Sequence, residues 1–510
     1  MFEGGKNLRW LKSLLLEAVW QKLCQWIRKL YQWIRQLLLS PPEFKKKWYS
    51  LPQFRRKLTA NLIIGLTVFA SLMIFHDLPW LMDTEDAYVD WMMEVRQGVI
   101  PSIKTEAKEI PPFVVLDIDD KTYYAWNEPL FTPRQRLKNL IAAAVKAKAR
   151  LIVVDVDVSQ PTPVEKSKLH PDDQRLKTYL TNYATKCRDE PDKSTCPPII
   201  LVRAFSAQPS AVPIPRTGFL EEVVSKSAPY VQWGSAHFYR SEDLVVRRWK
   251  LWQPACTIDN QPQVVPSVEL LAMALVNECS AEDIQKALKP FLPQCRDNND
   301  GSSPPLPETV KLCNLEISTK IRDINQRIMY TMPWLDDEAP PKLPYFTTTK
   351  SGESILTILP AQPYAESELK VSLDTLEDSI VLISGSYKDG RDIYLTPLGS
   401  MPGVVIIVNA IHSLLEYQKI EPTPLWGMLL ITGLIVMMSI IFAYFSSLWG
   451  VVFSGIFIIF ALLPLSMILF SYGIWLDFAL PLIIVQIYHI IYKCKKSEQP
   501  KPNDLNLFKN

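Results

Sequence analysis

Four apolar segments constrain this chain more than any other feature. They are residues 58–76, 425–446, 448–471 and 474–492. A helix needs about 20 apolar residues to cross the hydrocarbon core of a bilayer, so the segments predict four transmembrane helices. A buried core helix is the alternative for the first segment. A signal peptide fits it poorly, because residues 1–57 precede it and no small-residue cleavage site follows.

Positive charge is concentrated at the two ends of the chain. Residues 1–57 carry 13 Lys or Arg against 3 acidic residues, and residues 493–510 carry 5 Lys against 2 acidic residues, although the net charge is only +2. Segments rich in Lys and Arg stay on the cytosolic side of a membrane. Both ends are therefore expected in the cytosol, with residues 77–423 outside it. The same rule accounts for the basic residues without nucleic acid, so no nucleic-acid partner is expected.

The cysteines divide in the same way. Cys24 and Cys494 fall in the predicted cytosolic parts, and the other six of the eight fall in residues 77–423. These six are Cys187, Cys196, Cys256, Cys279, Cys295 and Cys313. An even number of cysteines in an oxidising compartment indicates disulfides, and the short loop between Cys187 and Cys196 makes them the favoured pair. Free buried thiols are the alternative. A zinc site is disfavoured because no CxxC pair occurs, and no cofactor is expected.

The basic N-terminal region has the periodicity of an amphipathic helix. Its apolar stripe is Val19, Leu23, Trp26, Leu30, Trp33 and Leu37. A basic, Trp-rich helix of this kind commonly lies on anionic membrane lipid. Packing against a partner or a second copy of the chain is the alternative. Residues 1–57 are therefore predicted to form a cytosolic region. Its amphipathic helix is expected to end at Pro41 and Pro42, because proline cannot continue a helix.

The region outside the membrane has the pattern of an α/β domain. Residues 113–118 and 151–156 are apolar runs typical of buried strands, and residues 134–149 between them have helical spacing. Thr132 is predicted to cap this helix, with Pro133 as its first residue. A strand–helix–strand unit of this kind predicts two parallel, neighbouring strands. Further strands are predicted at residues 198–204 and 379–384, and a helix at 404–417.

Acidic side chains follow these strands and make up the candidate ligand site. The candidates are Asp117, Asp119, Asp120, Asp155, Asp157, Asp392 and Arg134. Ligands bind beyond the carboxyl ends of parallel strands, so these side chains are expected to converge there. Gathered carboxylates need a cation, an amine or an arginine beside them, and Ca²⁺ or Mg²⁺ prefers such oxygen ligands, although no particular metal is indicated. A structural role is favoured over a ligand site, since Asp at a strand end often caps a turn.

A catalytic role has little support in the motifs. Asp117-Ile-Asp119 and Asp155-Val-Asp157 resemble the nucleophile motif of haloacid-dehalogenase-type phosphatases, but Lys121 and Ser159 stand where that motif has Thr or Val. No GxSxG, HExxH or GxxxxGK motif occurs. The protein is therefore not expected to be an enzyme.

The same residues resemble a known sensor family. Asp117 to Thr122, Trp126, Pro133-Arg134 and the strand ending Asp155-Val-Asp157 look like a CHASE2 domain. The late run from Ile380 to Gly385 continues the likeness, as do Asp392, Thr396-Pro397, Met401-Pro402-Gly403 and Asn409-Ala410. The resemblance implies a fold made of an α/β extracytosolic sensor domain on four transmembrane helices, here with an N-terminal cytosolic amphipathic helix. It also implies a bacterial inner-membrane protein with a periplasmic domain.

Three departures from that family shape the expected function. Residues 493–510 are too short for a kinase or cyclase, the middle of the domain carries a long insertion with cysteines, and Gln160 replaces an expected acidic residue. We therefore expect a sensor that signals through a separate cytosolic partner. The alternative is a non-enzymatic structural or assembly subunit of a membrane complex. A homodimer is a further expectation.

Overall fold

The chain divides into two compact units. Met1–His76, Leu425–Leu463 and Asp477–Asn510 belong to the smaller unit, and Asp77–Pro424 and Pro464–Leu476 to the larger. The computed structural model describes residues 52–74, 79–99, 110–163, 169–190, 195–206, 212–279, 281–295, 307–312, 315–319, 326–334, 354–368, 371–417, 425–445, 452–453 and 455–475. The amphipathic helix predicted within residues 1–57 and the membrane helix predicted at 474–492 lie almost entirely outside these residues.

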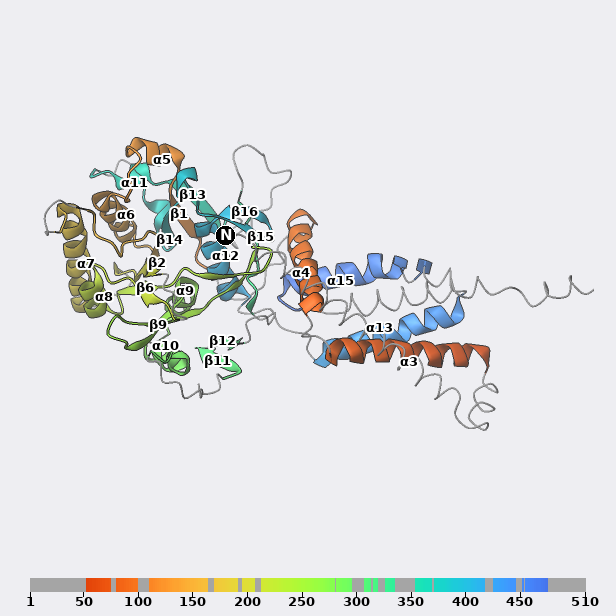
Figure 1. The fold of residues 1–510 in the computed structure, drawn as a ribbon. Coiled ribbons are helices and arrows are strands. Elements are labelled where there is room, and N and C mark those ends of the chain that lie inside the picture. Colours follow the sequence, from red (N-terminus) through yellow and green to blue (C-terminus); the bar gives the residue numbers. More distant parts are fainter. Residues whose placement is uncertain are drawn as a thin grey trace, which may run out of the picture. The chain divides into compact units, whose positions relative to one another are not determined.

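A six-stranded parallel sheet forms the centre of the larger unit (Figure 1). In spatial order its strands are β13 (Leu356–Pro360), β1 (Phe113–Ile118), β14 (Ile380–Gly385), β2 (Leu151–Val154), β3 (Ile199–Val202) and β6 (Val231–Gly234). Every residue of β1 and β2 is buried, which explains why these strands are almost wholly apolar rather than alternating.

Helices cover both faces of this sheet. One face carries α6 (Arg134–Lys146), α7 (Pro171–Asp189), α8 (Glu221–Ser227) and α11 (Gln362–Ala365), and the other carries α9 (Val268–Val276) and α12 (Gly403–Glu416). Alternate side chains of β1, Val114, Leu116 and Ile118, enter the core under α6 and α7. Successive residues of a strand point to opposite faces, so the remaining side chains of β1 face the second helix layer.

The predicted strand order is wrong in one respect. β1 and β2 are parallel, but they are not neighbours, because β14 lies between them and pairs with both. The helix α6 packs over β14 as well as β2, so the crossover from β1 spans two strand positions. Sequence adjacency therefore misled the prediction, since the central strand comes from much later in the chain.

The boundaries of α6 also differ from the prediction. Pro133 is the N-cap and makes no side-chain capping bond, so Thr132 is not the cap and the helix begins at Arg134. Extended backbone at Pro133, with ψ of 116°, sets this start. At the other end Lys148 has a φ of 57°, in the left-handed region, which ends the helix before residue 149.

Shorter elements surround the central layers. The antiparallel pairs are β4 (Phe205–Ser206) with β5 (Ile214–Pro215), β7 (Phe238–Arg240) with β8 (Val246–Trp249), β9 (Trp252–Cys256) with β10 (Pro262–Pro266), β11 (Thr309–Leu312) with β12 (Leu315–Ser318), and β15 (Ile393–Thr396) with β16 (Gly399–Pro402). The remaining helical segments of the larger unit are α4 (Pro79–Val99), α5 (Asp120–Ala125), α10 (Ala281–Leu288), η2 (Lys289–Phe291), η4 (Asp374–Leu376), η5 (Lys388–Gly390) and nearly all of α15 (Leu463–Ser471).

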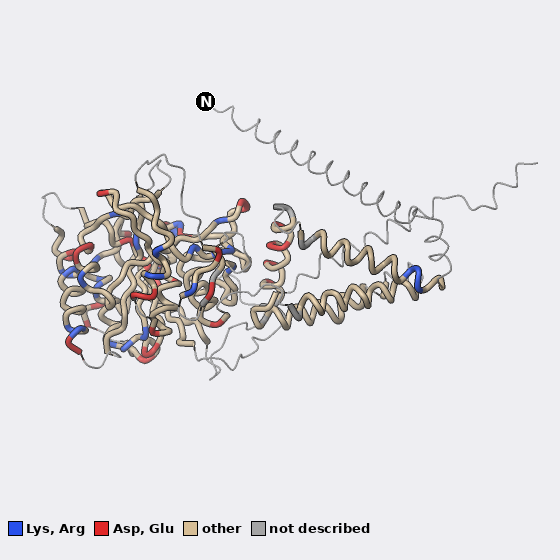
Figure 2. The backbone as a smooth tube through the Cα atoms, turned by 90° about the horizontal axis from the view of Figure 1, so that it is seen from below, with Lys and Arg blue, Asp and Glu red and all other residues tan. Residues whose placement is uncertain are grey.

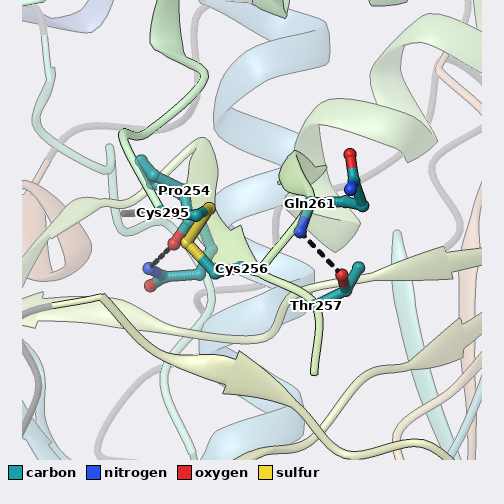
Figure 3. Close-up of a disulfide and its surroundings, with 6 residues drawn as sticks. Pro254, Cys256, Thr257, Gln261 and Cys295 are labelled. Atoms are coloured by element: carbon teal, nitrogen blue, oxygen red, sulfur yellow. Dashed lines mark hydrogen bonds between the residues drawn. A yellow bond between two sulfur atoms is a disulfide. The ribbon is translucent and has the colours of Figure 1, made fainter. Parts of the chain in front are cut away.

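Disulfides tie parts of the larger unit together. Cys187 at the end of α7 is bonded to Cys196, which confirms the pair favoured from the sequence. A second disulfide joins Cys256 of β9 to Cys295, beside the Thr257–Gln261 turn (Figure 3). Cys279 is also disulfide-bonded, and Cys313 lies outside the described residues.

Two apolar helices pack against each other in the smaller unit. The helices α3 (Gln53–Ile74) and α13 (Leu425–Tyr444) run antiparallel, since Asn61 reaches the carbonyl of Ser439 while Gly65 lies against Ile435. Apart from the basic residues at the start of α3, neither helix carries charge (Figure 2). Within the described residues, the stretch Gly427–Tyr444 is the one helical stretch long and apolar enough to cross a membrane. The four-helix anchor is therefore not established by this structure.

Candidate functional site at the sheet edge

Asp117 is the most enclosed acidic residue at the carboxyl edge of the sheet. It lies in β1 and is 5% exposed. Its two carboxylate oxygens accept hydrogen bonds from the backbone nitrogen and the hydroxyl of Ser386, at 2.9 and 2.6 Å. Burial raises the pKa of Asp117 to about 6, and the nearby carboxylates of Asp119 and Asp120 push it in the same direction. The side chain therefore fixes the loop that follows β14.

Asp119 and Asp120 accept hydrogen bonds from backbone nitrogens. Asp119 is the N-cap of α5 and accepts a hydrogen bond from the backbone nitrogen of Thr122 at 2.8 Å. Asp120 accepts one from the backbone nitrogen of Lys388, in the loop after β14, at 2.8 Å. Above this contact the rings of Tyr123 and Tyr387 stack, with centroids 4.2 Å apart. Both carboxylates therefore have structural partners.

Asp155 and Asp392 form a second acidic group at the same edge. Asp155 follows β2 and accepts a hydrogen bond from the hydroxyl of Ser384, the fifth residue of β14, at 2.9 Å. Burial, reinforced by the charge of Asp392, raises the pKa of Asp155 to about 7. The Asp392 carboxylate lies against Gly403, the first residue of α12, where a Cβ atom would be 2.4 Å from its oxygen. Glycine is therefore required at that helix start unless Asp392 moves.

Arg134 binds the loop after β2 rather than the carboxylates of Asp117 or Asp155. It is 1% exposed and donates hydrogen bonds to the backbone carbonyls of Asp157 and Gln160, at 3.0 and 3.1 Å. It also forms a buried ion pair with Asp173 of α7 at 3.7 Å. The Asp157 carboxylate accepts hydrogen bonds from the backbone and side chain of Ser159. Arg134 therefore holds the loop after β2 to two helices.

The candidate residues thus form two acidic groups rather than one. Asp117, Asp119 and Asp120 lie together, Asp155 lies with Asp392, and the end of β14 separates the two groups and supplies a serine to each. Throughout the described ranges, no set of three or more His, Cys, Asp or Glu side chains is placed to hold a metal ion. The edge is a hydrogen-bonded junction that connects β14, its loop and the start of α12.

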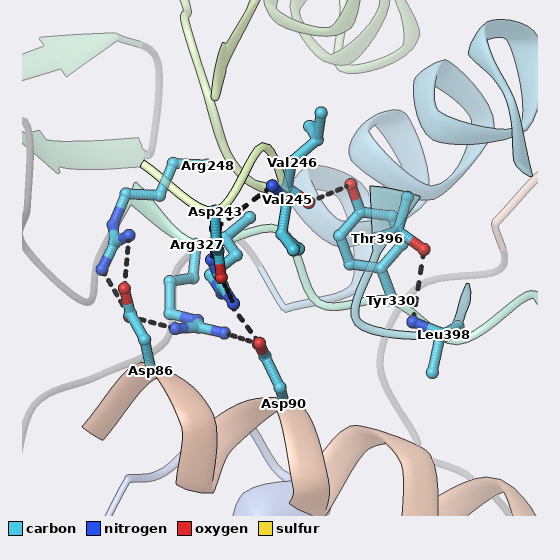
Figure 4. A network of polar contacts seen from close by, with 11 residues as sticks. Asp86, Asp90, Asp243, Val245, Val246, Arg248, Arg327, Tyr330, Thr396 and Leu398 are labelled. Carbon is cyan, nitrogen blue, oxygen red and sulfur yellow. Dashed lines mark hydrogen bonds and ion pairs between the residues drawn. The ribbon is translucent and has the colours of Figure 1, made fainter. Parts of the chain in front are cut away.

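A denser charged cluster lies elsewhere and was not anticipated from the sequence (Figure 4). We call it the ionic latch and define it as Asp86 and Asp90 of α4, Arg247 and Arg248 of β8, and Arg327. Arg248 binds both oxygens of Asp86, at 3.0 and 2.7 Å, and Arg247 donates to Asp90 at 2.8 Å. Arg327 contacts both aspartates and is 1% exposed.

The local sequence did contain a signal for this cluster. Asp86 and Asp90 are four residues apart, so they lie on one face of α4. Arg247 and Arg248 interrupt an otherwise apolar strand, where buried charge requires a partner. Burial alone would raise the pKa of Asp86, but Arg327 and Arg248 hold it below its usual value. A cavity of about 390 Å³ adjoins the Asp86 end, and residues 239–243 form part of its lining.

A polar stripe on α12 connects the latch to the second helix layer. Asn409 is fully buried, and its side-chain oxygen accepts hydrogen bonds from the backbone nitrogens of Thr331 and Met332, both at 2.9 Å. One turn further along, Ser413 accepts one from the backbone nitrogen of Met329 at 2.9 Å. Residues 326–334 are thus fixed to α12 through their backbone, and Arg327 in the same segment reaches α4.

This is a parallel α/β domain whose last helix, α12, is followed in sequence by an apolar helix long enough to cross a membrane. The sequence model of the CHASE2 domain family matches residues 63–444, most of the chain, and the chain therefore belongs to this family. CHASE2 domains are extracytoplasmic sensor domains. No curated protein and no solved structure matches the chain.

Proposed function

We propose that this protein is a multi-pass membrane sensor whose CHASE2 domain recognises a signal outside the cytosol and reports it to a separate cytosolic protein. The observation that carries the proposal is the extent of the family match, which begins inside α3 and ends at the last residue of α13. The family unit therefore includes both apolar helices together with the sheet domain. This extent supports a proposal in which recognition and membrane attachment belong to one family unit.

The sheet edge is linked along the chain to the apolar segment that begins at Leu425. Asp392, beside Asp155, lies against the first residue of α12, and α12 ends at Glu416, shortly before Leu425 begins α13. A ligand that binds one arrangement of this edge more tightly than another would favour the position of α12 that goes with it. We propose that the spans at 58–76, 425–446, 448–471 and 474–492 carry the change to the cytosolic side.

Charge distribution supports the proposed orientation. The basic ends favour a cytosolic location for residues 1–57 and 493–510, and the disulfides favour an oxidising compartment for the domain. Anionic lipid is the proposed contact of the N-terminal region, and a homodimer remains a prediction. The competing function is a structural subunit of a membrane complex, which the charge and disulfides fit equally well.

Affinity purification decides between the two functions. The full chain, tagged at its C-terminus, is purified from its native membrane in mild detergent, and the proteins that accompany it are quantified by mass spectrometry. We expect a cytosolic signalling protein in substoichiometric amount. A variant lacking residues 1–50 serves as the comparison and should lose this protein if it docks on the N-terminal region. A fixed-stoichiometry membrane complex, or no cytosolic protein at all, would overturn the sensor proposal.

A further inference from the structure

We infer that α4 is a coupling helix, which the ionic latch holds on the α/β domain and whose opposite side holds residues 464–475. The role of this coupling in signalling rests on the proposed function. The coupling itself is a property of the folded larger unit, to which α4, the latch and this segment all belong. It can therefore be tested without an effector.

The two sides of α4 carry different chemistry. Residues two positions apart on a helix point about 200° apart, so Tyr88 and Met92 lie opposite Asp86 and Asp90. The Tyr88 ring lies 5.4 Å from the Trp475 ring, centroid to centroid. The hydroxyl of Ser466 lies 3.7 Å from the Met92 sulfur. One side of α4 is thus ionic and meets the domain, and the other is aromatic and sulfur-rich and meets the last described segment.

The latch is matched in charge and largely enclosed. Arg247, besides its contact with Asp90, donates two hydrogen bonds to Asp243, at 2.7 and 2.6 Å. The guanidinium groups of the latch therefore meet the three carboxylates of Asp86, Asp90 and Asp243. Arginine does not deprotonate in proteins, so removal of one carboxylate leaves a buried positive charge short of its partner. This makes α4 sensitive to the position of the arginines.

Those positions depend on the rest of the domain. Arg327 is four residues from Thr331, whose backbone is bound by Asn409 of α12. The backbone nitrogen of Ile328 also donates to the carbonyl of Arg247 at 2.8 Å. A shift of α12 would therefore reach Asp86 and Asp90 through the backbone of residues 327–331 and the side chain of Arg327. A cavity of about 390 Å³ adjoins the Asp86 end of α4 and is lined by Arg247 and Arg248 as well.

Hydrogen exchange measured by mass spectrometry on the detergent-solubilised full chain tests this coupling. In Asp90→Asn we expect exchange in α4 to increase at least about tenfold, because the local opening free energy falls, and exchange in residues 464–475 to increase with it. Glu94→Gln is the matched control, since Glu94 is on the same helix, exposed and in none of the latch contacts. It should leave both regions unchanged. Tyr88→Ala should increase exchange in residues 464–475 while residues 326–334 stay protected.

The outcomes separate the coupling from other roles of the charges. If Asp90→Asn loosens α4 and leaves residues 464–475 as protected as before, or changes neither region, the inference is wrong. If the variant unfolds, so that β1 and β14 also exchange, Asp90→Glu replaces it, because the charge is kept and only its reach changes. Its increase should be confined to α4, residues 326–334 and residues 464–475. A failed search for cytosolic partners would overturn the sensor proposal without affecting this result.

Discussion

Three acidic side chains of the domain are held where ionisation is costly. Burial raises the pKa of Asp117 to about 6 and that of Asp155 to about 7. Glu269 in the first turn of α9 is fully buried, and burial raises its pKa to about 8. In the unfolded chain these groups ionise near pH 4, so the folded state loses stability as the pH rises from there until the folded pKa is passed. The domain should therefore be more stable at pH 5 than at pH 8.

Asp155→Asn tests this at a single residue. The amide cannot ionise but can still accept the hydrogen bond from Ser384, so the variant should lose less stability than wild type between pH 5 and pH 8. The expected difference is about 1–3 kcal/mol, since one unit of pKa shift corresponds to about 1.4 kcal/mol. Denaturant unfolding of the full chain in detergent at the two pH values measures it.

Asp157→Asn is the matched control for that measurement. Asp157 follows the same strand, is exposed, and serves the backbone of Ser159. Its replacement should cost a similar amount of stability at both pH values. An Asp155→Asn variant with the pH dependence of wild type would contradict the assignment of the titration to that carboxyl group.

At the scale of elements, two glycines in the apolar helices offer a matched pair. A Cβ atom at Gly65 of α3 would lie 2.6 Å from the Ile435 side chain, whereas a Cβ atom at Gly433 of α13 meets nothing within 4 Å. Close helix contacts of this kind depend on small residues. Gly65→Leu should therefore destabilise the α3–α13 pair by about 1–3 kcal/mol, and Gly433→Leu should have little effect.

Thermal aggregation of the purified protein in detergent, followed for both variants, measures the difference. The Gly433→Leu variant controls for the added bulk and for any change in insertion. Equal behaviour of the two variants would mean that α3 and α13 do not depend on close packing at Gly65.

The elements themselves were largely predictable, while their pairing was not. Apolar runs identified β1, β2, β3 and β14, because strands that are buried on both faces consist mostly of apolar residues. The position of β14 between β1 and β2 could not be read locally, since its hydrogen bonds join residues more than 200 positions apart. The predicted end of α6 was wrong, because the left-handed backbone at Lys148 ends the helix although the apolar spacing continues.

The candidate site was predictable to the same degree. The sequence indicated that Asp117, Asp155 and Asp392 follow strands or lie in a late loop, and the structure places them at the sheet edge. It did not indicate that Arg134 is buried against backbone carbonyls, because a helix pattern does not show which polar residue turns inward. The latch was missed since Asp86 and Arg327 are separated by 241 positions.

For the whole molecule, the cysteines report on where each part of the chain resides. Two disulfides are present in the larger unit, and Cys279 is bonded as well, whereas Cys24 and Cys494 fall in the predicted cytosolic ends. Oxidising compartments preserve disulfides, and the cytosol keeps thiols reduced. The proposed topology therefore predicts two classes of cysteine in one chain.

Counting reactive thiols tests that topology. A maleimide of high mass, added to denatured native protein without reductant, should shift its gel mobility by two steps, for Cys24 and Cys494. After reduction it should modify all eight cysteines. A variant with both Cys24 and Cys494 changed to Ser should show no shift before reduction. Eight reactive thiols without reductant would place the domain in a reducing compartment and contradict the proposed orientation.

The position of β14 also sets the order in which the domain can be completed. β1 and β2 each pair with this strand along one of their two edges, yet it follows β1 by more than 260 residues. In the proposed topology, the centre of the sheet stays open during synthesis and export until residue 385 has crossed the membrane. Contacts this distant form slowly and leave strand edges exposed to aggregation in the meantime. A nascent chain stopped before Ile380 should therefore remain dependent on chaperones, however many of its other strands and helices are already outside.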